Sequence, residues 1–209
     1  MPGPAAAEPL ACERALGALT GLALGDALGM PTQSMSPAQI RRCYGEITGL
    51  RDAVAEQPIA PSAPAGTVTD DTEQALILAG LLIDGGGRID PHQLADALLR
   101  WEDDMRARGS LDLLGPSTKL ALERVRAGAD PHCTGRQGTT NGAAMRVAPV
   151  GIAFSLSTDG DALARAVQAS CLVTHDTRQG FEAAGLLAAA VSAAIDGVDA
   201  AGALGAALD

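Results

Sequence analysis

Apolar residues recur three and four positions apart in several stretches of this 209-residue chain, the spacing of one face of an α-helix. No stretch alternates apolar and polar residues as a half-buried strand does. The pattern predicts an all-α protein with a single domain, residues 1–209, built as a bundle of antiparallel or obliquely packed helices. The stretches that we expect to be helical are 10–24, 75–83, 91–105, 116–128, 161–173 and 181–195.

Polar and glycine residues mark the ends of these helices. Asp90 is placed to cap a helix that has Pro91 in its first turn. Residues 130–147 contain several glycines and few apolar anchors, so we expect a long functional loop there. The residues expected on the buried face of the helix after Asp90 are Leu94, Leu98, Trp101 and Met105.

A stripe of glycines runs along the first predicted helix. Gly17, Gly21, Gly25 and Gly29 lie four positions apart, on one face. A glycine inside a helix costs up to about 1 kcal/mol relative to alanine, so the repeat predicts that a neighbour approaches the backbone closely there.

Composition and charge exclude several classes of protein. Aromatic residues make up only 2% of the chain, so the core must consist mainly of Ala, Leu, Val and Ile. The formal net charge of −10 argues against nucleic acid as the partner but leaves room for cations. The longest apolar run, 183–195, is shorter than the roughly 20 residues that a membrane span needs, and we expect neither a membrane span nor a signal peptide. Scattered cysteines indicate reduced thiols in the cytoplasm: Cys12, Cys43, Cys133 and Cys171.

Two neighbouring carboxylates stand at the head of an apolar helix, in the Thr-Asp-Asp-Thr segment 69–72. One interpretation is a capping box, with Asp70 and Glu73 or with Asp71 and Gln74. The other is a metal site, because two partly buried carboxylates repel each other unless a cation lies between them. Oxygen ligands of this kind suit Mg²⁺ or Mn²⁺.

Two further segments carry polar groups between helices. His175 follows an apolar helix, and it is either a structural histidine or part of a site; no nearby Cys or Ser motif supports covalent catalysis. Segment 141–146 is either a helix start with a polar cap or a place where backbone amides meet a sugar or phosphate. His92 and His132 receive no function from the sequence.

Taken together, four segments resemble the ADP-ribosylglycohydrolase family, in the manner of the dinitrogenase reductase-activating glycohydrolases. They occur in the order and rough spacing of that family and span nearly the whole chain. The segments are Gly-Asp-Ala-Leu-Gly at 25–29, Thr-Asp-Asp-Thr at 69–72, Asn-Gly-Ala-Ala-Met-Arg at 141–146 followed by Ala-Pro, and Thr-His at 174–175 with Gly180.

The resemblance implies an all-helical orthogonal bundle with a two-metal centre of Mg²⁺ or Mn²⁺ at the helix ends. It implies that Thr69, Asp70 and Asp71 are metal ligands. Asp70 or Asp71 would also act in catalysis by helping to deprotonate a water. The transition state at the ribose resembles an oxocarbenium ion, whose positive charge carboxylates stabilise.

The resemblance also implies the substrate. The loop with Asn141, Gly142 and Met145 would cradle ADP-ribose, and His175 would contact the substrate near the ribose. The implied reaction is hydrolysis at the anomeric carbon of the ribose, which releases ADP-ribose or a related ribosyl compound from a protein side chain or a small molecule.

Two departures from the family pattern keep alternatives open. Many members carry a glutamate where this chain has Gln33, which can bind substrate through hydrogen bonds but cannot serve as a general base. The second acidic and threonine motif of the family is missing, so we expect either a fragment without its C-terminal helices and half of its metal ligands, or a protein that lost them. The alternatives to the hydrolase are a catalytically impaired ADP-ribose binder or crystallin-like structural protein, and a hydrolase of a nucleoside-like metabolite.

Overall fold

The computed structural model describes residues 4–110 and 114–208, and every regular element in these ranges is helical. This confirms the all-α prediction. Two short 3-10 helices, η1 (Met30–Thr32) and η2 (Pro131–Cys133), accompany the α-helices. The α-helices are α1 (Pro4–Gly29), α2 (Pro37–Tyr44), α3 (Asp70–Asp84), α4 (Pro91–Ala107), α5 (Pro116–Arg126), α6 (Gly142–Arg146), α7 (Ala148–Ala153), α8 (Leu156–Cys171), α9 (Arg178–Ile195) and α10 (Ala200–Leu208).

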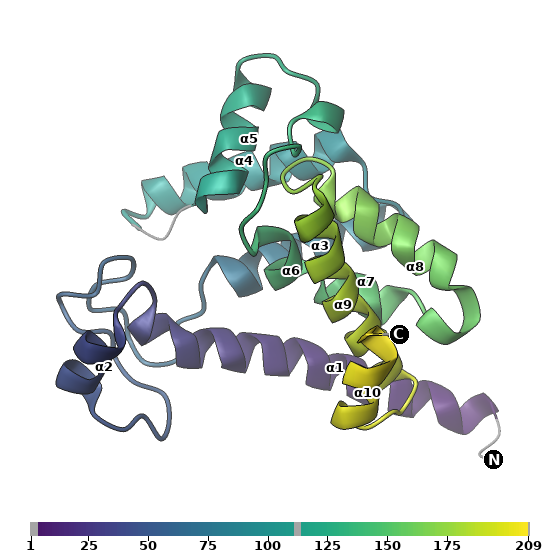
Figure 1. Ribbon diagram of the computed structural model, residues 1–209, viewed down its shortest axis with the longest axis horizontal. Coiled ribbons are helices and arrows are strands. Elements are labelled where there is room, and N and C mark those ends of the chain that lie inside the picture. Colours follow the sequence, from purple (N-terminus) through teal and green to yellow (C-terminus); the bar gives the residue numbers. More distant parts are fainter. Residues whose placement is uncertain (1–3, 111–113, 209) are drawn as a thin grey trace.

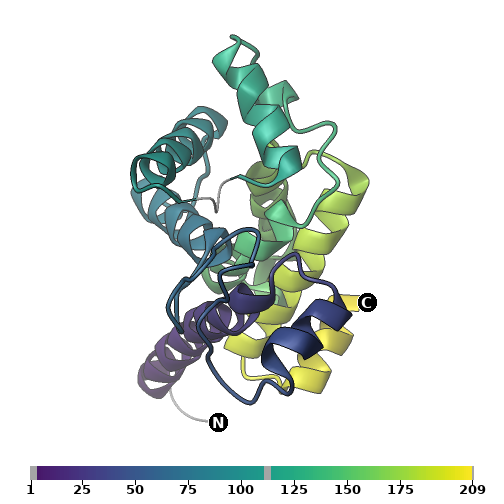
Figure 2. The ribbon, with the colours of Figure 1, turned by 90° about the vertical axis from the view of Figure 1, so that its left-hand side faces the viewer.

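The helices cross at steep angles around α9. Figure 1 shows α1 along one side of the molecule, with α9 running across it and α4 and α5 at the opposite end. Helix α9 contacts α6, α7, α8 and α10, while α3 packs against α6 and α7. The turned view in Figure 2 also shows oblique crossings, which is the arrangement expected of an orthogonal bundle.

The core confirms the prediction for α4. Asp90 caps the helix by accepting a hydrogen bond from the backbone amide of Gln93 at 3.0 Å. The core is aliphatic, as the composition requires, and no described helix is long and apolar enough to cross a bilayer. The four side chains expected on the inner face of α4 are all buried: Leu94, Leu98, Trp101 and Met105.

Several boundaries differ from the expectation. Residues 142–146 form helix α6 within the stretch 130–147 that we expected to be a loop, which agrees with the alternative of a helix start at 141–146, and η2 forms a further turn there. The pattern also missed α2, α7 and α10, which have only eight, six and nine residues. Helices this short give too few repeats for their period to stand out.

The expectation of a close neighbour along the glycine stripe of α1 is wrong. A Cβ atom built on Gly17, Gly21, Gly25 or Gly29 would meet nothing within 4 Å. Helix α1 lies along one side of the bundle (Figure 1), and all four glycines are exposed. Its C-terminal part has another use, because Gly25 and Gly29 line a cavity.

Candidate functional site

The N-terminus of α3 is held by a carboxylate from α1. Asp26 accepts hydrogen bonds from the backbone amides of Thr69 and Thr72 at 2.8 and 3.2 Å and from both threonine hydroxyls. Thr69 is the N-cap residue, but its side chain makes no capping hydrogen bond. Neither Asp70 nor Asp71 is the N-cap residue, so the two capping boxes that the sequence allowed at this helix are wrong.

The two neighbouring carboxylates experience different surroundings. Asp70 is buried, with 7% of its surface exposed, whereas Asp71 is half-buried and lies 3.4 Å from the Thr69 hydroxyl. Burial raises the pKa of Asp71 above its ordinary value, and the negative charge of Asp26 raises it further. A cation bound at this position would relieve both effects.

A fully buried guanidinium lies behind these carboxylates. Arg146, in α6, donates hydrogen bonds to the side chains of Gln74 and Thr174 and to the backbone carbonyl of Ser170. Burial lowers the pKa of Arg146 to about 10, and the charges of neighbouring acidic groups, Asp70 among them, counteract that effect. The guanidinium therefore stays charged at neutral pH and partly balances the acidic head of α3.

Two cavities open in front of the acidic cluster. Their volumes are about 320 and 370 Å³, and both are lined by Gln33, Asp71 and Asn141. Asp26 and Thr69 line the first, and Asp70 and Met145 line the second.

One buried acceptor in this region has no partner within the protein. Gln33 follows η1, and its side-chain oxygen Oε1 is buried without a hydrogen bond. A buried polar atom without a partner costs about 1–3 kcal/mol. Gln33 lines both cavities, so a ligand that donated a hydrogen bond to this oxygen would relieve that cost.

The glycine-rich segment before α6 packs tightly against the segment around His175. A Cβ atom on Gly138 would lie 2.0 Å from the Thr174 carbonyl oxygen, and one on Gly142 would lie 2.7 Å from His175 Cε1. Thr140 Oγ1 lies 3.0 Å from His175 Nε2. Glycine is needed at these positions because only a residue without a side chain permits such an approach.

His175 is neutral at physiological pH. Its side chain is fully buried, and burial together with the charge of Arg146 lowers the pKa of the imidazole to about 4. It does not line either cavity. Its contacts connect Thr174 and Thr140, so it supports the loop that carries Asn141 from behind.

The structure therefore brings most of the predicted site residues to one place. Thr69, Asp70, Asp71, Gln33, Asn141 and Met145 line the two cavities, while Gly142 and His175 lie behind the cavity wall. Sequence reasoning assigned no role to Asp26 or Arg146. Both stand inside the segments that carried the family resemblance, and an acidic residue among helical glycines was the available signal for Asp26.

The donor atoms fit one side of a site for a hard cation. Thr69 offers a hydroxyl and Asp70 and Asp71 offer carboxylates, which are ligands that Mg²⁺ and Mn²⁺ favour. Asp26 is already engaged in four hydrogen bonds. In the described ranges, Asp26, Asp70 and Asp71 do not form a group whose ligand atoms all lie within 4.8 Å of one another. Substrate, water or further ligands would therefore have to complete the coordination of an ion.

The sequence profile of the ADP-ribosylglycohydrolase family matches residues 7–209. The chain belongs to the ADP-ribosylglycohydrolase family.

Individual relatives of this ADP-ribosylglycohydrolase family member are similar along most of the chain. An uncharacterized protein of Escherichia coli is 36% identical over 88% of this chain and 55% of its own length. An ADP-ribosylarginine hydrolase of Pseudomonas putida is 33% identical over 90% of the chain and 48% of its own length. An ADP-ribosyl-dinitrogen reductase glycohydrolase of Rhodospirillum rubrum is 33% identical over 69% of the chain and 46% of its own length. The chain thus spans about half the length of these relatives.

Proposed function

We propose that the protein is a Mg²⁺- or Mn²⁺-dependent hydrolase that cleaves the glycosidic bond at the ribose of ADP-ribosylated protein side chains or of related ADP-ribose compounds. The observation that carries the proposal is the convergence of Asp70 and Asp71 with Asn141 and Gln33 in the walls of the two cavities. The names of two relatives, an ADP-ribosylarginine hydrolase and an ADP-ribosyl-dinitrogen reductase glycohydrolase, support the class of substrate.

The reaction consumes one water and breaks two bonds, the glycosidic bond and one O–H bond of the water. Water adds its oxygen to the anomeric carbon, the leaving group keeps the electron pair of the glycosidic bond, and the proton that leaves the water is finally passed to the leaving group. Either Asp70 or Asp71 would accept that proton, and we assign the role to Asp71 because this carboxylate lines both cavities. The negative charge of Asp70 and Asp71 would stabilise the positive charge that develops on the ribose.

Thr69, Asp70 and Asp71 would hold the metal. When bound, a divalent ion supplies fixed positive charge for ribose hydroxyls and lowers the pKa of a bound water.

Other residues of the chain bind and position. The unpartnered Gln33 Oε1 would accept a hydrogen bond from a ribose hydroxyl, and Asn141 would present its amide to the same ligand. His175 acts as a positioning residue, since it touches Thr140 and Gly142 rather than the cavities.

A direct assay tests the proposal. The full-length protein is incubated with Mn²⁺ and ADP-ribosylated arginine, ADP-ribosylated serine or small ribosides, and the products are identified by mass. Release of ADP-ribose that is lost in Asp71→Asn but kept in Asp104→Asn, an exposed carboxylate of α4, supports it. No release from any substrate by metal-loaded protein overturns it.

Gln33 favours a second candidate, an ADP-ribose binder with little turnover, because a glutamine cannot act as a base. Calorimetry with ADP-ribose separates the two functions. Binding without release of product favours the binder, and in that case Gln33→Glu should increase hydrolysis.

A further inference from the structure

A second group of metal-binding side chains lies outside the proposed hydrolase site. His92 stands in the first turn of α4, and Asp130 and His132 stand at the start of η2. One ligand atom from each of the three residues lies within 4.8 Å of the others. The fold therefore brings together residues that are far apart in the sequence.

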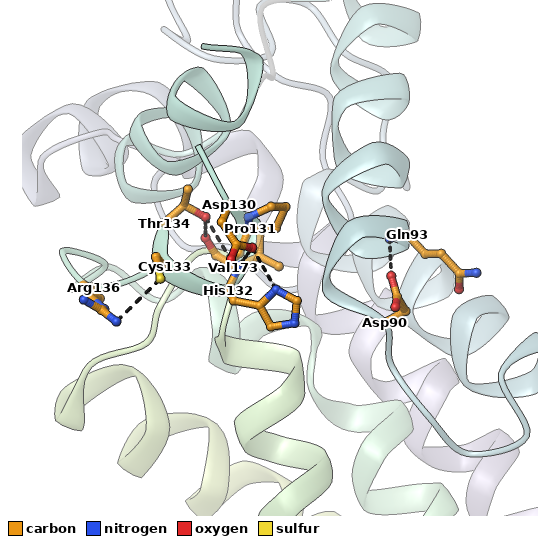
Figure 3. Close-up of polar contacts among 9 residues, drawn as sticks. All are labelled: Asp90, Gln93, Asp130, Pro131, His132, Cys133, Thr134, Arg136 and Val173. Carbon is orange, nitrogen blue, oxygen red and sulfur yellow. Dashed lines mark hydrogen bonds and ion pairs between the residues drawn. The ribbon is translucent and has the colours of Figure 1, made fainter. Parts of the chain in front are cut away.

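The group has a defined internal geometry. Asp130 accepts hydrogen bonds from the backbone amide of His132 at 3.0 Å and from its Nδ1 at 2.8 Å, so the carboxylate orients the imidazole. Figure 3 shows the contact between Asp130 and His132, which precede Thr134 in the same segment. The rings of His92 and His132 meet edge to face, with centroids 5.5 Å apart and an angle of 64° between the planes.

The surroundings leave space for an ion with its water. All three side chains are exposed, and together with Asp96 they line a surface cavity of about 500 Å³. In a tetrahedral zinc site, metal–nitrogen distances of about 2.0–2.1 Å place ligands roughly 3.3 Å apart. The ligand atoms here lie within 4.8 Å of one another, so the exposed side chains would have to turn toward the ion to reach that value.

The donor set selects a different metal from the oxygen ligands at α3. Two imidazoles and a carboxylate are ligands of zinc and similar transition metals, whereas Mg²⁺ favours oxygen atoms alone. Three protein ligands leave the fourth position of a tetrahedral ion for water or an external ligand.

We propose that His92, Asp130 and His132 form a surface site for Zn²⁺, separate from the acidic site at the head of α3. An ion there would link the start of α4 to the segment between α5 and α6. Directly after η2, Thr134 Oγ1 donates a hydrogen bond to the Val173 carbonyl at 2.7 Å (Figure 3). Zinc would therefore fix both ends of η2, upstream of the loop that carries Asn141.

The chain has few histidines, so the residues that bind zinc can be identified by substitution. The sequence contains three histidines, and the third, His175, is fully buried. Within this chain, zinc binding through a surface imidazole must therefore use His92 or His132. Thiols are the competing ligands, and Cys133 is exposed beside His132.

The experiment is a Zn²⁺ titration of the full-length protein by calorimetry, in excess Mg²⁺ to occupy the acidic site. We expect one equivalent of zinc to bind, and His92→Ala, His132→Ala and Asp130→Asn to weaken it at least about tenfold each. Cys133→Ser and Asp71→Asn are the matched controls and should keep wild-type affinity. Absorption of the Co²⁺ form should show ligand-field bands without a thiolate charge-transfer band.

Two results overturn the proposal. One is the absence of stoichiometric Zn²⁺ binding, which would leave the histidines as an edge-to-face pair only. The other is binding that survives both histidine substitutions or is lost in Cys133→Ser, which would assign the ion to a thiol. Because all substituted side chains of the site are exposed, unchanged melting of the variants in chelator verifies that they fold; His92→Gln serves as the second variant if His92→Ala does not.

Discussion

At the scale of single residues, the carboxylate of Asp71 combines an unfavourable environment with a useful position. Burial and the neighbouring Asp26 raise the pKa of its carboxyl, so the ionised form destabilises the metal-free protein. The same side chain lines both cavities. If Asp71 serves function at the expense of stability, its substitution should lower the hydrolytic rate but should not lower the free energy of unfolding.

Asp71→Asn tests this. We expect the hydrolytic rate to fall at least about 100-fold, because the proposed proton acceptor is lost. The free energy of unfolding without divalent metal should stay equal or rise, because the repulsion from Asp26 is removed. Kinetics with Mn²⁺ and urea unfolding in chelator measure the two quantities. A large loss of stability would contradict this account, and Asp104→Asn should change neither quantity.

His175 predicts a pH dependence of stability. The pKa of its imidazole is about 4 in the folded protein, against an ordinary value of 6.5, so the unfolded chain binds the proton more tightly. Stability is then fully present above pH 6.5 and is lost as the pH falls toward 4. Between pH 7 and pH 5 the loss attributable to this group is about 2 kcal/mol. Urea unfolding of wild type and His175→Gln at both pH values measures this loss. An equal change in the free energy of unfolding between pH 7 and pH 5 in the two proteins would contradict the assignment of the loss to His175.

The residues that sequence reasoning missed share a physical cause. Asp26 acts through backbone amides of a segment far along the chain, and Arg146 acts through Gln74 and Thr174. Such partners are set by packing, and no local spacing encodes them. Asp70 and Asp71 were identifiable because they stand side by side at a predicted helix start, where electrostatic repulsion is visible in the sequence itself.

At the scale of elements, α3 begins with a cap supplied by another helix. We expect Asp26→Ala to destabilise the fold by about 2 kcal/mol, because the amides and hydroxyls of Thr69 and Thr72 lose a charged acceptor. Asp90→Ala removes an ordinary cap within α4 and should cost about 1 kcal/mol. Thermal or urea unfolding compares the two.

The same Asp26→Ala variant should also lower the pKa of Asp71, since the neighbouring negative charge disappears. Carbon-detected NMR titration of the aspartate carboxyls measures that shift. An Asp71 pKa that stays raised to the same extent would mean that burial alone sets it.

The glycine-rich segment before α6 predicts a contrast between two identical substitutions. Gly138→Ala should destabilise the protein by about 1–3 kcal/mol or more, because its Cβ would overlap the Thr174 carbonyl at 2.0 Å. Gly21→Ala, at an open position within α1, should stabilise it by up to about 1 kcal/mol. Unfolding curves of both variants check this. Equal effects would show that the loop relaxes to accept a side chain.

Elements were predictable where a long amphipathic period coincided with a cap. Helix α4 has Asp90, Pro91 and four buried apolar residues at helical spacing, and its position was found from the sequence. Helix α2 has no buried residue, and its capping box of Ser36 and Gln39 is its only strong signal. The glycine stripe of α1 led to the wrong prediction of a close neighbour. Glycine spacing indicates where a helix backbone can be approached, whereas the presence of a neighbour there depends on the whole fold.

At the scale of the whole molecule, the candidate site exists only after folding. Its cavities are lined by residues from the end of α1 and η1, the start of α3, the segment before α5, and α6. The family resemblance predicted most of these residues as a set, because it compares segments in order along the chain. It gave no indication of the group of His92, Asp130 and His132, which lies outside the segments that carried it.

Two metal sites of different chemistry should stabilise the molecule independently. In the two proposals, Mn²⁺ at the head of α3 and Zn²⁺ at His92 and His132 would bind the folded chain through separate ligands, so each would add about RT ln(1 + [metal]/Kd) to its stability. The two increases in melting temperature should therefore add. Asp70→Ala should abolish only the increase caused by Mn²⁺, and His132→Ala only that caused by Zn²⁺. If both increases vanish in either variant, the ions share one site, and the chemistry that we assign to the two groups of ligands is wrong.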